Sequence, residues 1–194
     1  MHKMVENQVR ISVRDLVEFV LRSGDLDNRR AAVNREAMRE GSRIHRKIQK
    51  RMGAGYQAEV AMKMAFPAGN VEIVLEGRAD GVMTETDGSV TIDEIKGMYQ
   101  DVTLFQEPLL VHRAQAVCYA YMYAVSHGME QMGIQMTYCN IETEETRRFR
   151  EVCTMERLED EVQSYIREYA KWAQFLYEHR KKRNASIKGL EFPY

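Results

Sequence analysis

Two segments of the chain, 76–81 and 92–97, contain the residue types that hydrolysis of a phosphate ester requires. The first, EGRADG, carries Asp80, and the second, IDEIKG, carries Glu94 and Lys96. Carboxylate oxygens bind Mg²⁺, which keeps several waters and accepts phosphate oxygens. Such an ion polarises a phosphoryl group and lowers the pKa of a bound water. A nearby amine can orient that water or offset charge that grows on the phosphate.

The spacing of these segments predicts that their charged side chains share one face of a β-hairpin. A three-residue loop at 86–88 ends in glycine, which suits the positive φ that such a loop needs at its last position. Counting outward from this loop pairs Asp80 with Glu94, and Lys96 lies on the same face. A divalent cation would relieve the repulsion between the two carboxylates. A two-residue loop at 87–88 would separate them, and a charged surface hairpin is the alternative interpretation.

Two predicted helices add polar groups to this hairpin. His45 follows Gly41 by about one turn, so we expect that helix face to approach the sheet closely and the imidazole to complete a metal shell. His112, Gln115 and Tyr119 lie on one face of a later helix. Gln115 could orient the lysine, and Tyr119 could donate to a phosphate. The alternatives are a structural histidine and a buried tyrosine–glutamine packing pair.

The composition is typical of one globular domain that spans residues 1–194. Hydrophobic residues make up 44 % of the chain and charged residues 29 %. The apolar runs are far shorter than the roughly 20 residues of a membrane span. The N-terminus lacks the apolar core of a signal peptide. We therefore expect a cytoplasmic protein with no membrane partner.

Charge is unevenly distributed although the net charge is only −1. The segment 29–51 contains nine basic residues against two acidic ones, and 180–183 is a second basic cluster. The segment 142–161 is acidic. Local basic clusters could face phosphates, while a solvated helix face explains each of them equally well.

The elements that must position these residues alternate between helix and strand. The predicted helices span 12–21, about 30–51, 108–127 and 155–183, and the predicted strands span 56–66, 71–84, 90–96, 132–141 and 146–152. The first three strands suit an antiparallel meander. The pattern predicts an α/β (α+β) fold with a central mixed sheet of about five strands flanked by helices. The tail, 184–194, has little pattern.

Four motifs of the RecB-like exonuclease branch of the PD-(D/E)xK superfamily occur here in the order that the family shows. They are GxxxH on a helix, G-[RK]-x-D and (D/E)xK on successive strands, and QxxxY on the next helix. In this sequence they stand at 41–45, 77–80, 94–96 and 115–119. Each motif is weak alone, but the ordered set is fairly specific. The resemblance implies a restriction-endonuclease-like core.

The resemblance also assigns roles to individual positions. Four groups would bind a divalent metal ion, Mg²⁺ or Mn²⁺: His45, Asp80, Glu94 and the main-chain carbonyl of Ile95. The predicted catalytic set is Asp80, Glu94, Lys96, Gln115 and Tyr119. Basic and polar side chains beside these motifs are expected to contact nucleic acid: Arg43, Arg46, Lys47, Arg78 and His112.

Three further stretches, 11–17, 23–26 and 189–194, resemble the nuclease module that precedes DinG/XPD-like helicases in some Firmicutes. In those proteins the last stretch leads into the helicase core. The resemblance therefore implies a fused or partner helicase, with 184–194 as a linker, and leaves open that this chain is a fragment. No GxxxxGK[ST] phosphate loop occurs in the sequence, so we expect no ATP hydrolysis by this chain.

Cysteine usage bears on one further cofactor. Some RecB-like relatives hold an iron–sulfur cluster with one cysteine upstream of the nuclease core and three downstream. Here Cys118 is the first of only three cysteines, followed by Cys139 and Cys153, so no cluster is expected. Their odd number and wide spacing indicate buried free thiols.

Two hypotheses from different classes account for these features. The first is a metal-dependent DNase that acts on single strands or ends. The second is a catalytically silent nucleic-acid-binding module that guides a helicase. The sequence leaves open DNA versus RNA, exonuclease versus endonuclease and its polarity, one metal or two, and the oligomeric state.

Overall fold

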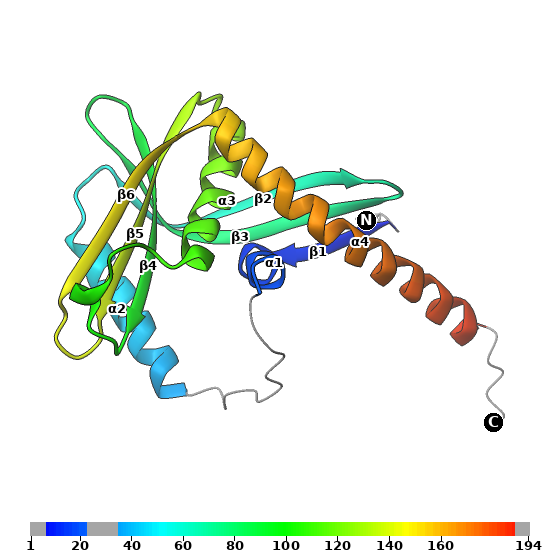
Figure 1. The fold of residues 1–194 in the computed structure, drawn as a ribbon, viewed down its shortest axis with the longest axis horizontal. Coiled ribbons are helices and arrows are strands. Elements are labelled where there is room, and N and C mark those ends of the chain that lie inside the picture. Colours follow the sequence, from blue (N-terminus) through cyan, green and yellow to red (C-terminus); the bar gives the residue numbers. More distant parts are fainter. Residues whose placement is uncertain (1–6, 23–34, 189–194) are drawn as a thin grey trace.

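The computed structural model describes residues 7–22 and 35–188 as a mixed sheet with helices on both faces (Figure 1). The six strands are β1 (Gln8–Ser12), β2 (Tyr56–Ala68), β3 (Val71–Thr84), β4 (Val90–Met98), β5 (Gln131–Asn140) and β6 (Thr146–Thr154). The helices are α1 (Val13–Val20), α2 (Arg35–Arg51), α3 (Leu110–His127) and α4 (Met155–Lys188), with a short 3₁₀ helix at Val102–Leu104. The prediction of a mixed sheet flanked by helices is confirmed.

The strand order is β1-β3-β4-β5-β6. β2 pairs with β3 along nearly its whole length, from Val71 to Met83, on the edge opposite to the one that β1 and β4 share. β2, β3 and β4 form the predicted antiparallel meander. β4 and β5 are parallel and are joined through α3, and β5 and β6 are antiparallel. The central strand β3 therefore changes neighbours along its length, and the functional site lies at this change.

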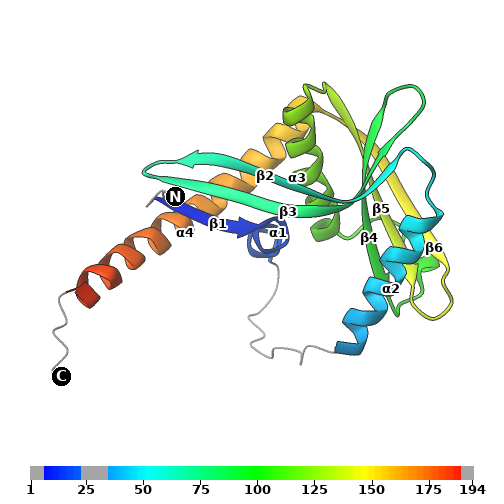
Figure 2. The same cartoon turned by 180° about the vertical axis from the view of Figure 1, so that it is seen from behind.

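The helices cover the two faces of the sheet unequally. α1, α3 and α4 bury the larger apolar cluster, in which Leu16, Val117 and Leu158 pack against β3 and β5. α2 lies on the opposite face, as the reverse view shows (Figure 2), and packs Ile44 and Ile48 against Ile95 of β4. This packing brings α2 and α3 to the same region of β4 from opposite sides. None of the helices in the described ranges is long and apolar enough to cross a membrane.

The predicted hairpin register is confirmed. Glu85 donates its N–H to the carbonyl of Ser89 at 2.9 Å, and Gly88 has φ of +83°. The paired residues run from Thr84 opposite Val90 to Gly81 opposite Asp93. A three-residue loop with glycine in the left-handed region therefore closes the hairpin.

Several local expectations differ from the structure. Strand β1 was missed, because only Val9 of its five residues is buried and a parallel partner far along the chain supplies its hydrogen bonds. Helix α4 continues to Lys188, so the predicted tail begins within a helix. The predicted helical residues 30–34 lie outside the described part of the chain. The interpretation of all three cysteines as buried free thiols is confirmed.

Arg113 joins three elements through ion pairs, and its loss is expected to destabilise the fold. Its guanidinium, 15 % exposed, donates to Glu151 of β6 at 2.5 Å and to Glu161 of α4 at 2.7 Å. Arg113→Ala leaves both carboxylates with a lost partner, so we expect a decrease of about 3 kcal/mol in the free energy of unfolding, measured with urea.

Arg157 provides a matched control because it pairs with the same two carboxylates but is 52 % exposed. Arg157→Ala should cost only about 0.2–1 kcal/mol. Burial tends to raise the pKa of Glu161, but Arg113 outweighs it and holds that pKa below its usual value. Stability from this pair is therefore present above the ordinary glutamate pKa and lost as pH falls through the lowered one. Equal losses in the two variants would contradict this account.

Candidate active site

The site forms where β3 and β4 part. Their ladder ends at the pair of Gly81 and Asp93, one position before Asp80 and Glu94 would face each other. There the carboxylate of Asp80 accepts the main-chain N–H of Ile95 at 2.7 Å in place of a ladder hydrogen bond. The opening is the edge of a cavity of about 640 Å³. Strand divergence thus opens a cavity beside carboxylates that a continuous ladder would have kept on a flat sheet.

All six side chains that were predicted to be catalytic or metal-binding line this cavity together. The set comes from α2, β3, β4 and α3 and consists of His45, Asp80, Glu94, Lys96, Gln115 and Tyr119. The seventh position, Ile95, has its side chain buried against α2, so only its main chain can face the site. Cavity-lining residues that sequence reasoning missed include Arg14, Gln49 and Glu59.

Lys96 is held in place by two buried oxygen acceptors. Its Nζ donates to Glu94 Oε1 at 2.6 Å and to Gln115 Oε1 at 2.9 Å. Glu94 and Gln115 are each only 4 % exposed. Burial raises the pKa of Glu94 to about 7, against the opposing charge of Lys96 and with a further increase from Asp80. Burial therefore makes the negative charge of Glu94 unfavourable even beside the Lys96 ammonium.

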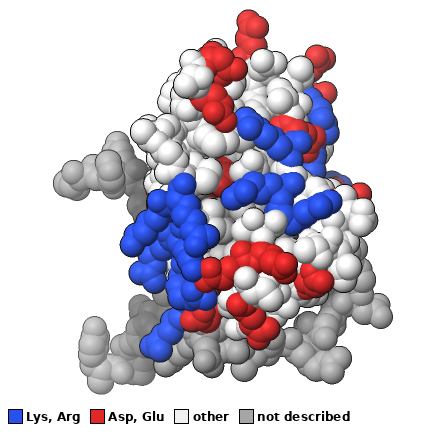
Figure 3. Space-filling model, turned by 90° about the vertical axis from the view of Figure 1, so that its left-hand side faces the viewer, with Lys and Arg blue, Asp and Glu red and all other residues white. Residues whose placement is uncertain are grey.

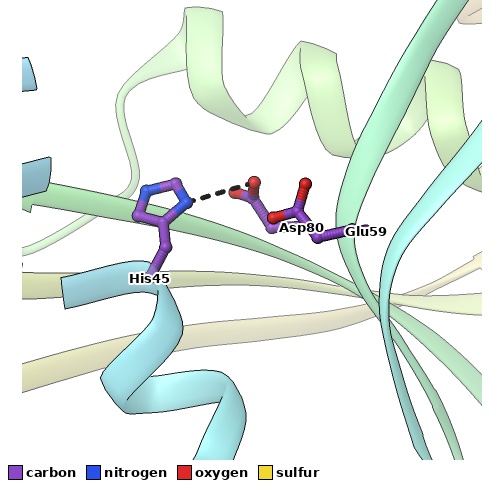
Figure 4. A group of neighbouring side chains, drawn as sticks. All are labelled: His45, Glu59 and Asp80. Atoms are coloured by element: carbon purple, nitrogen blue, oxygen red, sulfur yellow. Dashed lines mark ion pairs between the residues drawn. The ribbon is translucent and has the colours of Figure 1, made fainter. Parts of the chain in front are cut away.

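His45 approaches Asp80 from α2. Its Nδ1 lies 3.3 Å from Asp80 Oδ1, and the two side chains point toward each other and toward Glu59 (Figure 4). Burial by itself would lower the pKa of His45, but the hydrogen bond and charge of Asp80 outweigh it and raise that pKa. The negative charge of Asp80 therefore favours a positively charged group at this position, whether a protonated imidazole or a metal ion.

Glu59 joins this group through an unusual backbone conformation. β2 pairs Ala58 with Gly81 and Val60 with Ala79, so Glu59 falls opposite Asp80, but its φ is +58°. Non-glycine residues with positive φ are uncommon and concentrate at functional sites. The sequence alone could have placed Glu59 opposite Asp80, by counting back from the two-residue loop between β2 and β3. The positive φ of Glu59, in contrast, leaves no signal in the sequence.

Two polar side chains fix the orientation of the Glu59 carboxylate. Arg78 Nε lies 2.6 Å from its Oε2, and Gln49 Nε2 donates to its Oε1 at 3.0 Å. The same Gln49 amide also donates to the carbonyl of Asp80 at 2.9 Å. Gln49 therefore ties β2 and β3 together at the point where their ladder is interrupted.

The donor set fits a divalent metal ion. Among the described residues, one potential ligand atom each from His45, Glu59 and Asp80 lies within 4.8 Å of the others. Carboxylate oxygens suit Mg²⁺, and Mn²⁺ also accepts an imidazole nitrogen. Glu94 adds a buried carboxylate on the Lys96 side, where burial and, to a smaller extent, the charge of Asp80 raise its pKa. The residues present therefore match the predicted cofactor, with Glu59 as an additional candidate.

The glycine of the G-[RK]-x-D motif has a packing explanation. A Cβ at Gly77 would lie 2.5 Å from the hydroxyl oxygen of Tyr119. The Tyr119 hydroxyl accepts a hydrogen bond from the main-chain N–H of Arg78. Burial raises the pKa of Tyr119. The two motifs are thus complementary, because the absent side chain on β3 makes room for the ring from α3.

The expected close approach of α2 to the sheet at Gly41 is present, but it does not depend on the glycine. A Cβ at this position would meet no atom within 4 Å, so close approach of α2 to the sheet does not require a glycine there. A Cβ at the nearby Gly97 of β4 would lie 3.6 Å from Gly41 Cα, an ordinary contact distance. His45 reaches the cavity because Ile44 and Ile48 anchor the helix, and not because a small residue precedes it.

These two glycines, Gly77 and Gly41, make a matched pair of substitutions. Gly77→Ala should reduce the free energy of unfolding by about 1–3 kcal/mol, because Tyr119 must move from a packed position. Gly41→Ala should be neutral or slightly stabilising, because alanine is the better helix former. Urea unfolding of both variants measures the difference. A Gly77→Ala protein as stable as the wild type would contradict the packing explanation.

The basic residues predicted to contact nucleic acid divide into two groups. Arg46 and Arg78 line the cavity. Arg43 and Lys47 instead pair with Glu144 in the turn after β5. This differs from the expected cluster around the site, because an acidic turn far along the chain lies beside the same face of α2.

His112 also lies away from the cavity-lining set. Its Nδ1 is 3.2 Å from the hydroxyl of Tyr138, and its ring packs against that residue. Burial lowers the pKa of His112 to about 4, with further decreases from the charges of Lys96 and Arg14. A neutral imidazole paired with a tyrosine is a poor phosphate contact, so its position favours a structural role.

The side of the molecule formed by α2 and β6 carries both signs of charge. Figure 3 shows basic side chains in groups that are interrupted by acidic ones. Exposed basic residues on these two elements are Arg39, Arg46, Lys50, Arg51, Arg147, Arg148 and Arg150. Electrostatic attraction for phosphates on this side is therefore local.

The fold and the cavity define a class: a mixed α/β protein with two carboxylates, a lysine and a histidine gathered where two strands part. The family model of the PD-(D/E)XK nuclease superfamily matches residues 2–193. The chain belongs to the PD-(D/E)XK nuclease superfamily. Comparison with curated protein sequences found no match.

Solved structures with the same fold have low sequence identity to this chain. The crystal structure of SSO0001 has a TM-score of 0.51 at 19 % identity, covering 85 % of this chain and 78 % of that one. LHK-Exo in complex with dAMP has a TM-score of 0.54 at 12 % identity, covering 91 % and 94 %. LHK-Exo is described as an alkaline exonuclease from Laribacter hongkongensis. These likenesses establish a shared fold.

Proposed function

We propose that this protein is a metal-dependent deoxyribonuclease that hydrolyses phosphodiester bonds at DNA ends or in single strands. The observation that carries the proposal is the meeting of Asp80, Glu94, Lys96 and His45 around one cavity. Membership of the nuclease superfamily supports the same chemistry. A silent binding module would need none of this arrangement, in which a lysine is buried between two acceptors beside paired carboxylates.

The residues of this chain divide the work between holding a metal ion and holding the reacting groups. His45, Asp80, Glu94 and the carbonyl of Ile95 would hold Mg²⁺ or Mn²⁺, with Glu59 near enough to contribute. When bound, such an ion polarises the phosphoryl group and makes a coordinated water more acidic. The main-chain N–H of Ile95 fixes the Asp80 carboxylate at 2.7 Å, so its orientation is set before an ion binds.

Lys96 is the group that would act on the phosphate. Gln115 on α3 accepts a hydrogen bond from the Lys96 ammonium at 2.9 Å through its side-chain amide oxygen. This bond restricts the Lys96 side chain to the cavity. A fixed ammonium stabilises negative charge as it grows on phosphate oxygens, since no reorganisation is needed. Arg46 at the cavity margin would bind a flanking phosphate, and Arg78 would do so beside its ion pair with Glu59. Tyr119 supports the β3 backbone and can donate to a phosphate.

The preference for ends is tested with matched DNA topologies. The structurally similar LHK-Exo is known in complex with dAMP, which supports a mononucleotide as the expected product. Linear and circular single-stranded DNA, linear duplex and single-stranded RNA are incubated with Mg²⁺, Mn²⁺ or EDTA. We expect metal-dependent loss of linear DNA, persistence of circular DNA and persistence of RNA. If linear DNA stayed intact with every metal ion, the proposed nuclease activity would be refuted.

The resemblance to modules of DinG/XPD-like helicases extends the proposal to a partner. A helicase that unwinds duplex would supply the single strands that this site would degrade. Adding such a helicase with ATP should increase cleavage of linear duplex by this chain, while helicase without ATP should not. If the helicase did not stimulate cleavage, the proposed partnership would be wrong, while the nuclease proposal would be unaffected.

A further inference from the structure

A row of aromatic rings runs along the outer side of α1 and α4. Phe19 of α1 packs edge-on against Tyr169 at a centroid distance of 5.3 Å and lies nearly parallel to Trp172 at 6.3 Å. Trp172 stacks on Phe175 at 5.1 Å, and Phe175 stacks on His179 at 6.1 Å. Tyr169 is buried and anchors the row to the core, while the other rings continue outward along the helix.

The outer rings leave much of their area exposed to solvent. Phe19 is 41 % exposed, Trp172 43 % and Phe175 55 %. Large aromatic side chains bury about 150–250 Å² each when covered, so leaving three neighbours exposed forgoes substantial stabilisation. Contiguous exposed apolar surface on a soluble protein indicates an interaction site. We call Phe19, Trp172, Phe175 and His179 the aromatic row.

Along α4 the aromatic row is flanked mainly by basic residues, whereas α1 adds the acidic residues Asp15 and Glu18 beside Phe19. Between residues 167 and 183, six basic residues stand against the two acidic residues Glu168 and Glu178. The exposed basic side chains are Arg167, Lys171, Arg180, Lys181, Lys182 and Arg183. A second copy of this chain would bring the same positive charge against itself, which opposes self-association. A polyanion with aromatic groups matches both properties of the surface.

Helix α1 lies between the aromatic row and the catalytic cavity, because Arg14 and Phe19 lie about 140° apart around its axis. Arg14 of this helix lines the cavity, and Phe19 follows five residues later, about 7.5 Å along the helix axis. α1 lies beside α4 in both ribbon views (Figures 1 and 2). A strand bound along the row would have to pass over α1 to reach the cavity.

We propose that the aromatic row binds single-stranded nucleic acid, with bases stacked against its rings and phosphates near the basic side chains of α4. Bases of every kind stack on aromatic side chains, so this binding is independent of sequence. The proposal rests on the proposed function in that it names where the substrate strand of the nuclease is held. Binding at the aromatic row differs from the proposed nuclease activity because it needs neither a metal ion nor cleavage.

The chain contains one tryptophan, Trp172, so its fluorescence reports on this surface alone. A twenty-nucleotide oligo-dT, labelled for anisotropy, is titrated with protein in EDTA, and Trp172 fluorescence is followed with unlabelled oligo-dT. We expect saturable quenching at the concentrations where anisotropy rises. A blunt duplex of equal length, whose bases are already stacked, should quench far less.

Phe175→Ala tests the row while keeping the reporter. We expect at least about fivefold weaker binding of oligo-dT. The matched control is Leu104→Ala, which removes a 73 % exposed apolar side chain from the short 3₁₀ helix and should bind like the wild type. Circular dichroism checks that both variants keep their helices. The titration of the wild-type protein tests the proposal even if a variant fails to fold.

Three outcomes would overturn the proposal. Oligo-dT could bind by anisotropy without changing Trp172 fluorescence, or Phe175→Ala could bind as tightly as Leu104→Ala. Light scattering could also reveal a dimer that Phe175→Ala abolishes, which would make a second copy the occupant. Quenching in EDTA together with intact DNA in the cleavage assay would support the row and refute the nuclease, so the two failures are distinguishable.

Discussion

Replacing Lys96 by alanine is expected to reduce DNA cleavage by about 10²–10³-fold, the loss typical of removing one oriented group that stabilises transition-state charge. The ammonium is held 2.6 Å from Glu94 and 2.9 Å from Gln115, so it occupies one position rather than sampling many. Oligo-dT binding in EDTA should change little, because the aromatic row lies outside the cavity. The measurement is the initial rate of nucleotide release at saturating Mn²⁺.

Lys63→Ala serves as the control because this lysine is an exposed residue of β2 outside the catalytic cavity. It should cleave at the wild-type rate. A Gln115→Leu variant adds a second comparison, since it leaves the ammonium in place but removes one of its two acceptors. It should lower the rate less than Lys96→Ala does. A Lys96→Ala protein as active as the wild type would remove this residue from the mechanism.

Asp80→Asn is expected to abolish both metal-dependent stabilisation and cleavage. The amide keeps the size of the side chain and an oxygen that can accept the Ile95 N–H, which spans 2.7 Å in the wild type. It lacks the negative charge that a divalent cation requires. A ligand that binds only the folded state stabilises it by about 2.7 kcal/mol at 100 times its dissociation constant. We therefore expect Mn²⁺ to raise the melting temperature of the wild type and not that of Asp80→Asn.

The control is Asp160→Asn, at an exposed position of α4. It should keep the full Mn²⁺-dependent shift. Glu59→Gln distinguishes a ligand from a bystander at the third position of the cluster, because a ligand's loss reduces the shift while retaining the fold. If Asp80→Asn showed the wild-type shift, the metal ion would have to bind elsewhere in the molecule.

The local features of the site could be predicted from the sequence because local rules determine them. The hairpin loop needs a residue with positive φ at its last position, and Gly88 supplies it. Alternation along the strand then assigns Asp80, Glu94 and Lys96 to one face. The helical period does the same for Gln115 and Tyr119. The capping of α1 by Ser12, which accepts the N–H of Asp15 at 3.0 Å, was also readable from spacing.

Features that depend on partners far apart along the chain were decided by the tertiary structure alone. β1 forms because β3 offers it a parallel edge, and Arg43 and Lys47 turn away from the cavity because Glu144 lies beside α2. Glu59 joins the cluster through a backbone conformation that only the packed sheet can hold. Periodicity and spacing describe neighbours within an element, whereas long-range contacts decide which charges are neutralised and which aromatic rings stay exposed.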